Sequence, residues 1–223
     1  MQIKERLTQI ISELPQDVTL VAVTKTMPVS VIQEAYQAGQ RIFGENKVQE
    51  MVHKQPELPN DIEWHMIGHV QRNKVKYMAS FVSLIHGVES LKLLKEIDKQ
   101  ARKQERIIDC LFQIKIAEED SKFGMSVEGA VEILNSDIFK ELKHINIKGV
   151  MGMATFTQNK EQIKREFDYL KSTYDQLSEF KSFNCNFEII SMGMSGDYQL
   201  AIDCGSTLVR IGSSIFGPRN YSV

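Results

Sequence analysis

The sequence predicts an α/β fold, a single (β/α)8 TIM-type barrel preceded by an extra N-terminal helix. Along the 223 residues, eight apolar strand-like runs alternate with amphipathic helical runs, and continuous apolar runs are typical of parallel strands covered on both faces. Eight such units can close a barrel, and the chain length lies near the lower end for this fold. The first strand is followed by "TKTMP" rather than a glycine-rich GxGxxG turn, which favours the barrel over an open doubly wound sheet.

The expected strands are short apolar segments bounded by polar residues. They lie at residues 18–24, 40–44, 62–67, 81–86, 107–116, 145–151, 187–191 and 207–211. Each strand except the last is followed by a helix or a helix-like link. No repeat or linker interrupts this alternation, so one domain over residues 1–223 is expected.

Helices are expected at 1–15, 30–39, 90–104, 126–136, 160–180 and 197–206. In the first of them, apolar residues recur at helical spacing, namely Ile3, Leu7, Ile10, Ile11 and Leu14. Ser90 and Ser126 are placed to cap helix N-termini, and Gly39 is placed to end a helix. These signals position the helices between the strands.

Composition limits the partners and the compartment. With 27 basic and 29 acidic residues, the formal net charge is −2, which argues against nucleic acid or an anionic membrane as a partner. No apolar run approaches the roughly 18 residues of a membrane span, and the N-terminus lacks a secretory signal pattern. Cys110, Cys185 and Cys204 form no CxxC pair and are expected to be free thiols. A cytoplasmic protein is therefore expected.

Lys25 stands directly after the first apolar strand, at the end of the barrel where this fold carries its chemistry. One interpretation is a snorkelling or salt-bridged lysine at a strand end. The other is a partly desolvated amine with a lowered pKa, which condenses with an aldehyde to a Schiff base. The strand pattern alone leaves both interpretations open.

Glycine and serine are concentrated after the last two expected strands, in "SMGMSGDYQLA" and "RIGSSIFG". Either segment alone is explained by ordinary turns. Together they occupy the positions where this fold commonly binds phosphate through backbone N–H groups. A Schiff-base lysine and a phosphate site suit a phosphorylated aldehyde, and pyridoxal 5′-phosphate (PLP) fits that description.

Five sequence motifs bear on this prediction of a PLP site: "VAVTKTMP", "IFGENKVQE", "WHMIGHVQRNK", "SMGMSGDYQLAI" and "GSTLVRIGSSIFGPRNY". Between about residues 18 and 221 the chain resembles the pyridoxal-phosphate homeostasis protein family, single-domain relatives of the alanine racemase N-terminal barrel. The resemblance implies PLP fold type III without the C-terminal β-domain. It also implies a non-catalytic PLP carrier or buffer that delivers the cofactor to apo-enzymes. Without the contacts of a second domain, a monomer is expected.

The resemblance implies that Lys25 holds PLP as a Schiff base, with Asn46 beside the cofactor and His65 and Gly68 at the pocket floor. It assigns the phosphate to the segment of Met194 and Ser195 and to Gly212 and Ser213, and it places Arg210 opposite the pyridine nitrogen. A cation there makes the ring a weaker electron sink, so little carbanion chemistry is expected. A salt bridge at the barrel mouth is the alternative role for Arg210.

Two lysine positions bear on cofactor transfer. Many relatives carry a second lysine two residues after the Schiff-base lysine, and this chain has Met27 there. Any transfer role of that lysine is therefore in doubt. Lys122 matches another lysine common in the family, and it is either a secondary cofactor contact or an ordinary loop residue.

Two enzymatic alternatives stay open. An amino-acid racemase needs a second base, which the racemases take from a C-terminal domain, and nothing in the sequence places Tyr198 in that role. A sugar-phosphate isomerase needs a carboxylate base at a strand end, for which Glu45 is the nearest candidate. His65 and His69 are four residues apart but read as strand and loop, so no metal site is expected.

Overall fold

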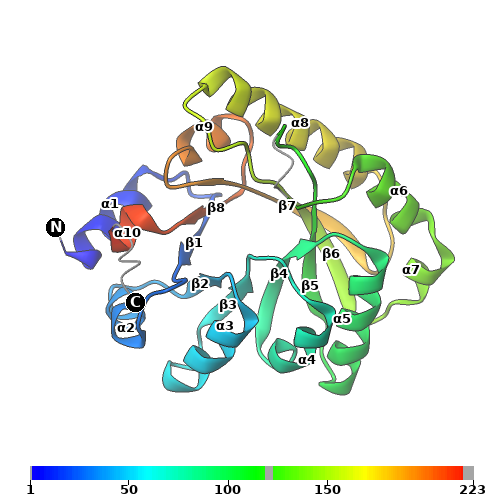
Figure 1. Cartoon of the computed structure of the whole chain (residues 1–223), viewed down its shortest axis with the longest axis horizontal. Coiled ribbons are helices and arrows are strands. Elements are labelled where there is room, and N and C mark those ends of the chain that lie inside the picture. Colours follow the sequence, from blue (N-terminus) through cyan, green and yellow to red (C-terminus); the bar gives the residue numbers. More distant parts are fainter. Residues whose placement is uncertain (1, 119–122, 218–223) are drawn as a thin grey trace.

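The expected barrel is confirmed in the computed structural model, which describes residues 2–118 and 123–217 (Figure 1). Eight parallel strands form a closed barrel in chain order. The pairing of Thr19 with Leu208 and of Ala22 with Ile211 closes the sheet between the first and last strands. The strands are β1 (Thr19–Val23), β2 (Ile42–Glu45), β3 (Glu63–Met66), β4 (Val82–Val88), β5 (Ile108–Gln113), β6 (Ile145–Met151), β7 (Cys185–Met194) and β8 (Leu208–Ile211).

Helices surround the barrel on its outside (Figure 1). The long ones match the expected ranges within a few residues: α1 (Ile3–Glu13), α2 (Val29–Gln37), α5 (Leu91–Lys103), α6 (Val127–Asn135) and α8 (Lys160–Ser178). Short helices that the sequence patterns did not identify are α3 (Val48–Lys54), α4 (Val75–Met78), α7 (Asp137–Glu141) and α10 (Ser213–Phe216). The sequence analysis assigned no helix after the last strand, and the one-turn α10 lies there. The helix α9 (Tyr198–Asp203) is shorter than expected.

The expected helix boundaries have physical counterparts. The hydroxyls of Ser90 and Ser126 accept hydrogen bonds from Leu93 N and Gly129 N, the N-caps of α5 and α6. Gly39 follows the last turn of α2. All three cysteines are buried free thiols. No helix within the described residues is long and apolar enough to cross a membrane.

The apolar side chains form two layers. The larger layer lies between the strands and the surrounding helices and includes Phe43, Trp64, Phe112 and Phe167. A smaller inner cluster fills the barrel with Val21, Val23, Ile67, Leu84, Leu111, Met151 and Leu208. Alternation along each strand divides the side chains between these layers. Polar side chains within the barrel therefore come from positions that share the inner face.

The N-terminal helix α1 lies beside α10 (Figure 1). Arg6 Nε donates a hydrogen bond to the carbonyl of Ile215 in α10. Leu7 is buried, with 1% of its surface exposed, and packs in the outer apolar layer. Because α10 has a single turn, α1 supplies much of the apolar cover that a full-length last helix would give.

Candidate functional site

Lys25 lies in a tight turn just beyond the end of β1. It is half-buried, and the turn is closed by a hydrogen bond from Met27 N to the Thr24 carbonyl (2.9 Å). Thr26 has a φ of 66°, a backbone conformation that costs a non-glycine residue about 1 kcal/mol or more. Its amide donates to Glu50 Oε1 at 2.5 Å. The backbone on both sides of Lys25 is therefore fixed by specific hydrogen bonds.

A buried lysine holds this turn from beneath. Lys54, in α3, is 4% exposed. Its Nζ donates to the Thr24 carbonyl at 2.9 Å, to Glu45 Oε1 at 2.8 Å and to Glu50 Oε1 at 2.6 Å. These bonds use all three N–H donors of the ammonium. Lys54 thus ties the end of β1, the end of β2 and α3 into one unit that carries Lys25.

Glu45 belongs to this unit and has no access to solvent. Its Oε1 also accepts a hydrogen bond from the Thr24 hydroxyl at 2.6 Å. Its Oε2 is buried and has no hydrogen-bond partner among the described residues. Burial raises the pKa of this carboxyl although Lys54 acts in the opposite direction. A carboxylate that is 0% exposed does not reach a substrate, so the structure gives no support to Glu45 as an isomerase base.

Asn46 and Gly68, which the sequence assigns to the same pocket, lie against each other. A Cβ at position 68 would lie 2.2 Å from the Asn46 carbonyl oxygen, so only glycine allows this approach of the loops after β2 and β3. Asn46 is exposed, whereas Gly68 and the nearby His65 are buried. The structure therefore brings the loops after β2 and β3 together beside the end of β1.

The loops after β7 and β8 also meet. Ser195 Oγ accepts hydrogen bonds from the amides of Gly212 (3.2 Å) and Ser214 (3.4 Å). Met194 N donates to Asp197 Oδ1 at 2.6 Å and so closes the turn before α9. A Cβ on Gly212 would lie 3.3 Å from Val23. The amide-rich segment that includes Ser213 is therefore adjacent to the strand that leads to Lys25.

Arg210 is buried in β8, and its guanidinium makes hydrogen bonds to residues of β7 and of the loop after β6. Its Nη1 donates to Ser191 Oγ at 2.5 Å and its Nη2 to the Gly152 carbonyl at 3.0 Å. Burial lowers the pKa of Arg210 to about 10, and Asp197 partly offsets that shift. The guanidinium thus stays charged at neutral pH. Its carboxylate neighbour Asp197 has a pKa raised by burial.

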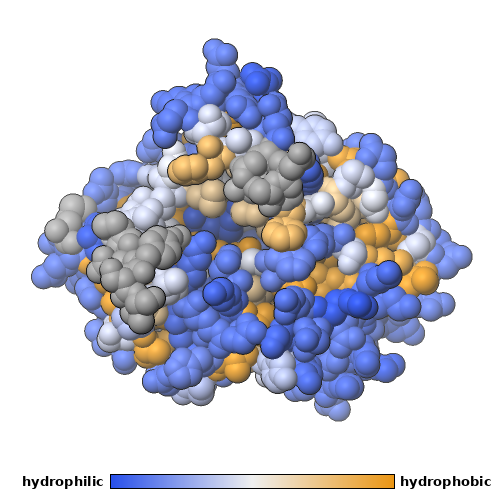
Figure 2. All heavy atoms as spheres, in the orientation of Figure 1, coloured by the Kyte–Doolittle hydropathy of each residue, from blue (hydrophilic) through white to orange (hydrophobic). Residues whose placement is uncertain are grey.

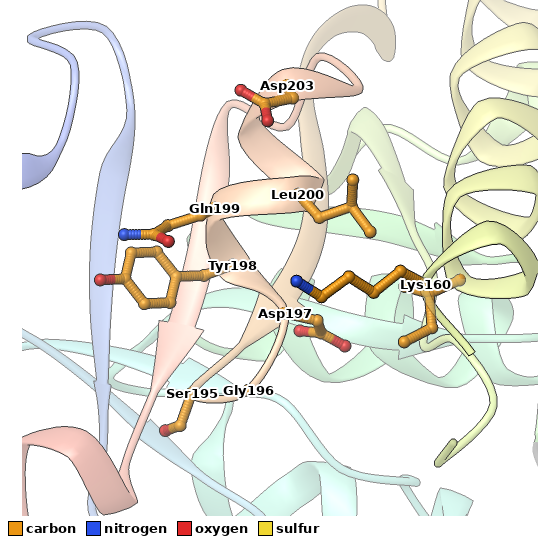
Figure 3. A pocket seen from close by; sticks show the side chains of 9 residues that line it. Lys160, Ser195, Gly196, Asp197, Tyr198, Gln199, Leu200 and Asp203 are labelled. Carbon is orange, nitrogen blue, oxygen red and sulfur yellow. The ribbon is translucent and has the colours of Figure 1, made fainter. Parts of the chain in front are cut away.

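A surface pocket of about 340 Å³ lies on the other side of the Ser195 loop (Figure 3). Its walls come from the start of α8, including Lys160, and from α9, including Tyr198 and Leu200. In Figure 3 the Ser195 side chain points away from Lys160. Of the residues that the sequence assigns to the cofactor, Ser195 is the one that lines this pocket, which is therefore distinct from the site at Lys25. Apart from the grey atoms, the face in Figure 2 is mainly hydrophilic, and it is hollowed near its centre.

Several residues of this region had no assigned role in the sequence. Lys54 and His86 are buried polar residues. In the sequence, all that marks them is that each interrupts an otherwise apolar pattern. Met27 is half-buried and packs on the outer apolar layer, which gives this position a structural use. Lys122 lies outside the described residues.

Comparisons with known proteins agree with the resemblance in the sequence. Residues 1–220 match the family described as "Alanine racemase, N-terminal domain". Proteins named "Pyridoxal phosphate homeostasis protein" are 37% identical in Aquifex aeolicus and 35% in Escherichia coli. The alignments cover 91% of this chain and 87% of the Aquifex protein, and 93% of this chain and 88% of the Escherichia protein.

Solved structures give the same family and fold. PipY of Synechococcus elongatus PCC7942, determined with PLP bound, has a TM-score of 0.87 and 33% identity, with 97% of this chain and 100% of PipY covered. An alanine racemase of Clostridium difficile 630 has a TM-score of 0.79 at 15% identity. That alignment covers 99% of this chain but 61% of the racemase, and it supports the barrel fold alone. The chain belongs to the alanine racemase N-terminal domain family and, within it, to the pyridoxal phosphate homeostasis proteins.

Proposed function

We propose that this protein binds PLP as a Schiff base on Lys25 and acts in PLP homeostasis as a non-catalytic carrier. PipY, which covers nearly the whole chain, was solved with PLP bound, and the curated relatives carry the name of PLP homeostasis proteins. PLP supplies an aldehyde that reacts with amines and a ring that withdraws electrons. The residues of this chain decide how much of that chemistry is used.

One observation carries the proposal: Gly212 packs against Val23, two residues before Lys25. In the same loop cluster, the amides of Gly212 and Ser214 converge on the Ser195 hydroxyl. Backbone amides and a serine hydroxyl are suitable donors for a phosphate. A lysine amine and a phosphate cradle at one end of one barrel suit a single phosphorylated aldehyde.

The neighbouring residues would orient the ring. Asn46 and Gly68 come from adjoining loops beside β1. His65 would contribute to the pocket floor, and Met194 and Ser213 would flank the phosphate. Arg210, held by Ser191 and Gly152, would face the pyridine nitrogen as a cation. That arrangement disfavours protonation of the ring and so limits its ability to stabilise a carbanion.

A further contact supports a carrier rather than a racemase. Tyr198 is the tyrosine nearest the phosphate loop in the sequence, and its hydroxyl donates to Glu13 Oε2 of α1 at 2.8 Å. This engagement with α1 leaves Tyr198 poorly placed as a second base over a substrate carbon. We further propose that the protein is a cytoplasmic monomer that transfers PLP to apo-enzymes.

The first test is the absorbance spectrum after addition of PLP. A band at roughly 420 nm, where protonated Schiff bases absorb, is expected for the wild type and should be lost in Lys25→Ala. Lys47→Ala is the matched control, because Lys47 is exposed and lies close to the same loops. A Lys25→Ala variant that keeps the band would remove Lys25 as the attachment site.

The second test separates the carrier from an enzyme. The PLP-loaded protein is incubated with L-amino acids in heavy water, and Cα deuteration is followed by mass spectrometry. A carrier should give little exchange, whereas exchange at the rate of a racemase would refute the non-catalytic role.

Recovery of activity by an apo PLP enzyme mixed with the loaded protein measures delivery. Light scattering at several protein concentrations tests the monomer.

A further inference from the structure

Four buried side chains form a continuous hydrogen-bonded chain inside the barrel. Arg210 Nη1 lies 2.5 Å from Ser191 Oγ, Ser191 Oγ lies 2.9 Å from His86 Nδ1, and His86 Nε2 lies 3.1 Å from His65 Nδ1. Ser191 and His86 are 0% exposed, and Arg210 and His65 are 4% and 5% exposed. The imidazole rings are 5.2 Å apart between centroids.

This series of hydrogen bonds crosses the interior of the barrel. His86 is in β4 and Ser191 is in β7, and β5 and β6 separate these strands in the closed order. Each of the four residues stands two positions from an apolar residue that belongs to the inner cluster (Ile67, Leu84 and Leu208) or packs against it (Ile189), on its own strand or strand end. Because alternate residues of a strand share a face, the four polar side chains point inward.

The donors and acceptors that these side chains offer fix the direction of each hydrogen bond in the series. A guanidinium donates and cannot accept, so Ser191 Oγ is the acceptor of its bond with Arg210. Among the described residues, the one acceptor within reach of the Ser191 hydroxyl hydrogen is His86 Nδ1. A neutral His86 then carries its proton on Nε2 and donates it to His65 Nδ1. The opposite direction would leave a buried hydroxyl hydrogen without an acceptor, which is unfavourable.

We infer that Arg210, Ser191, His86 and His65 form a one-way hydrogen-bond relay that holds both histidines as neutral Nε2–H tautomers with no lone pair free. Burial supports the neutral forms, since it lowers the pKa of His65 to about 3 and that of His86 well below its ordinary value. In this state each Nδ1 accepts a hydrogen bond and each Nε2 carries a hydrogen. Neither imidazole has a free lone pair with which to abstract a proton.

The relay gives Ser191 and His86 the role of positioning residues. Ser191 holds one guanidinium nitrogen of Arg210 and connects it to a partner that is itself held by His65. In this arrangement His86 and His65 act as hydrogen-bond donors through Nε2, and neither imidazole is available as a base. That property suits a protein that holds a reactive aldehyde without processing a substrate, and it can be tested in the protein without PLP, independently of the proposed function.

The test is the tautomer of each ring, read from long-range 1H–15N correlation spectra of protein labelled with 15N-histidine. The resonances of His65 and His86 are assigned by their loss in His65→Asn and His86→Asn. The wild type should show a protonated Nε2 and an unprotonated Nδ1 in both rings. A protonated Nδ1 on either ring would overturn the relay, and this result requires no variant at Ser191.

Variants at Ser191 test the direction-setting step. Ser191→Ala removes the hydroxyl, so the nitrogen resonances of both rings should shift toward a mixture of tautomers. Ser191→Thr keeps a hydroxyl and should retain the wild-type tautomers. Ser206→Ala is the matched control, because within the described part of the chain this buried hydroxyl donates to backbone carbonyls alone, those of Ile190, Met192 and Leu208. Unchanged tautomers in a folded Ser191→Ala would remove Ser191 from the relay.

Discussion

Two carboxylates share one buried ammonium beneath the Lys25 turn. Lys54 contacts Glu45 and Glu50 at 2.8 and 2.6 Å, and the side chains of Lys54 and Glu45 are almost completely buried. A buried pair of this kind adds modest net stability, but loss of one partner leaves the other charge without compensation. Removal of Lys54 is therefore costly mainly because it leaves the buried Glu45 carboxylate without a counter-charge. The hydrogen bonds to the backbone of Thr24 and Thr26 come from Lys54 and Glu50 of the same cluster.

Lys54→Met should lower the free energy of unfolding by about 3–5 kcal/mol at neutral pH. Burial already raises the pKa of Glu45 above 4.5, and loss of Lys54 raises it further. The native state then binds more protons than the unfolded state, so stability falls as pH rises through the pKa of the folded protein. The loss should shrink at acid pH, where Glu45 is protonated, and urea unfolding at a series of pH values measures it.

The control for this substitution is Lys164→Met. Lys164 pairs with Asp168 at 2.7 Å on the surface of α8, and exposed pairs contribute little. The double variant Lys54→Met with Glu45→Gln should recover part of the lost stability, because the uncompensated charge is gone. Equal losses of unfolding free energy in Lys54→Met and Lys164→Met would show that the buried cluster contributes no more to stability than the exposed pair.

Among the secondary-structure elements, β6 and β7 approach each other closely at a single glycine, where their register shifts. The register shifts between Ile147 and Gly149, and Gly149 has a φ of 151°. A Cβ at this position would lie 1.8 Å from the Ile189 carbonyl oxygen. The close approach sets the course of β7, which carries Ser191 to the barrel interior and ends at Met194 before the Ser195 loop.

Gly149→Ala should destabilise the protein by about 3 kcal/mol or more, since it combines an unfavourable φ with a clash against backbone. Gly129→Ala is the matched control in α6, where the nearest atoms to an added Cβ are 3.7 and 3.8 Å away. This change should be neutral or stabilising by up to about 1 kcal/mol. Thermal unfolding of both variants measures the difference, and similar melting temperatures would contradict the role of Gly149.

For the whole molecule, closure of the barrel joins the two ends of the described chain. β1 pairs with β8, and α1 covers this region together with the short α10. Tyr198 adds a hydrogen bond between α9 and Glu13 of α1. The N-terminal helix is therefore expected to unfold together with the barrel, and its loss would expose apolar surface next to β1 and β8.

Leu7→Ala should cost about 2–5 kcal/mol, because Leu7 is 1% exposed and its removal leaves a cavity. Ile11→Ala on the same helix is the control, since Ile11 is 47% exposed and should cost far less. Unfolding is followed by fluorescence of Trp64, the single tryptophan, and by circular dichroism. Coincident single transitions are expected. A separate early transition in the dichroism would indicate that α1 unfolds independently of the barrel.

The sequence predicted the barrel because its signals are local and repeated. Apolar runs at 145–151 and helical periodicity at Leu7 and Ile10 each reflect burial of a whole segment. The one-turn α10 and the short α3 were not found, since four to seven residues carry too little periodicity. The assignment of Lys25 and of the loop at Ser195 came from position within the expected fold and from family motifs, and their roles with PLP stay predictions.

By itself, the sequence determined the order of the strands, the end of the barrel where Lys25 stands and the glycine- and serine-rich character of the last two loops. Only the tertiary structure decided which distant polar groups meet: Lys54 beneath Lys25, and Arg210, Ser191, His86 and His65 across the interior. The physical reason is that periodicity records whether a side chain is buried. It does not record the partner, because a hydrogen bond across the closed barrel joins residues far apart in the chain, such as His86 and Ser191, which are 105 positions apart.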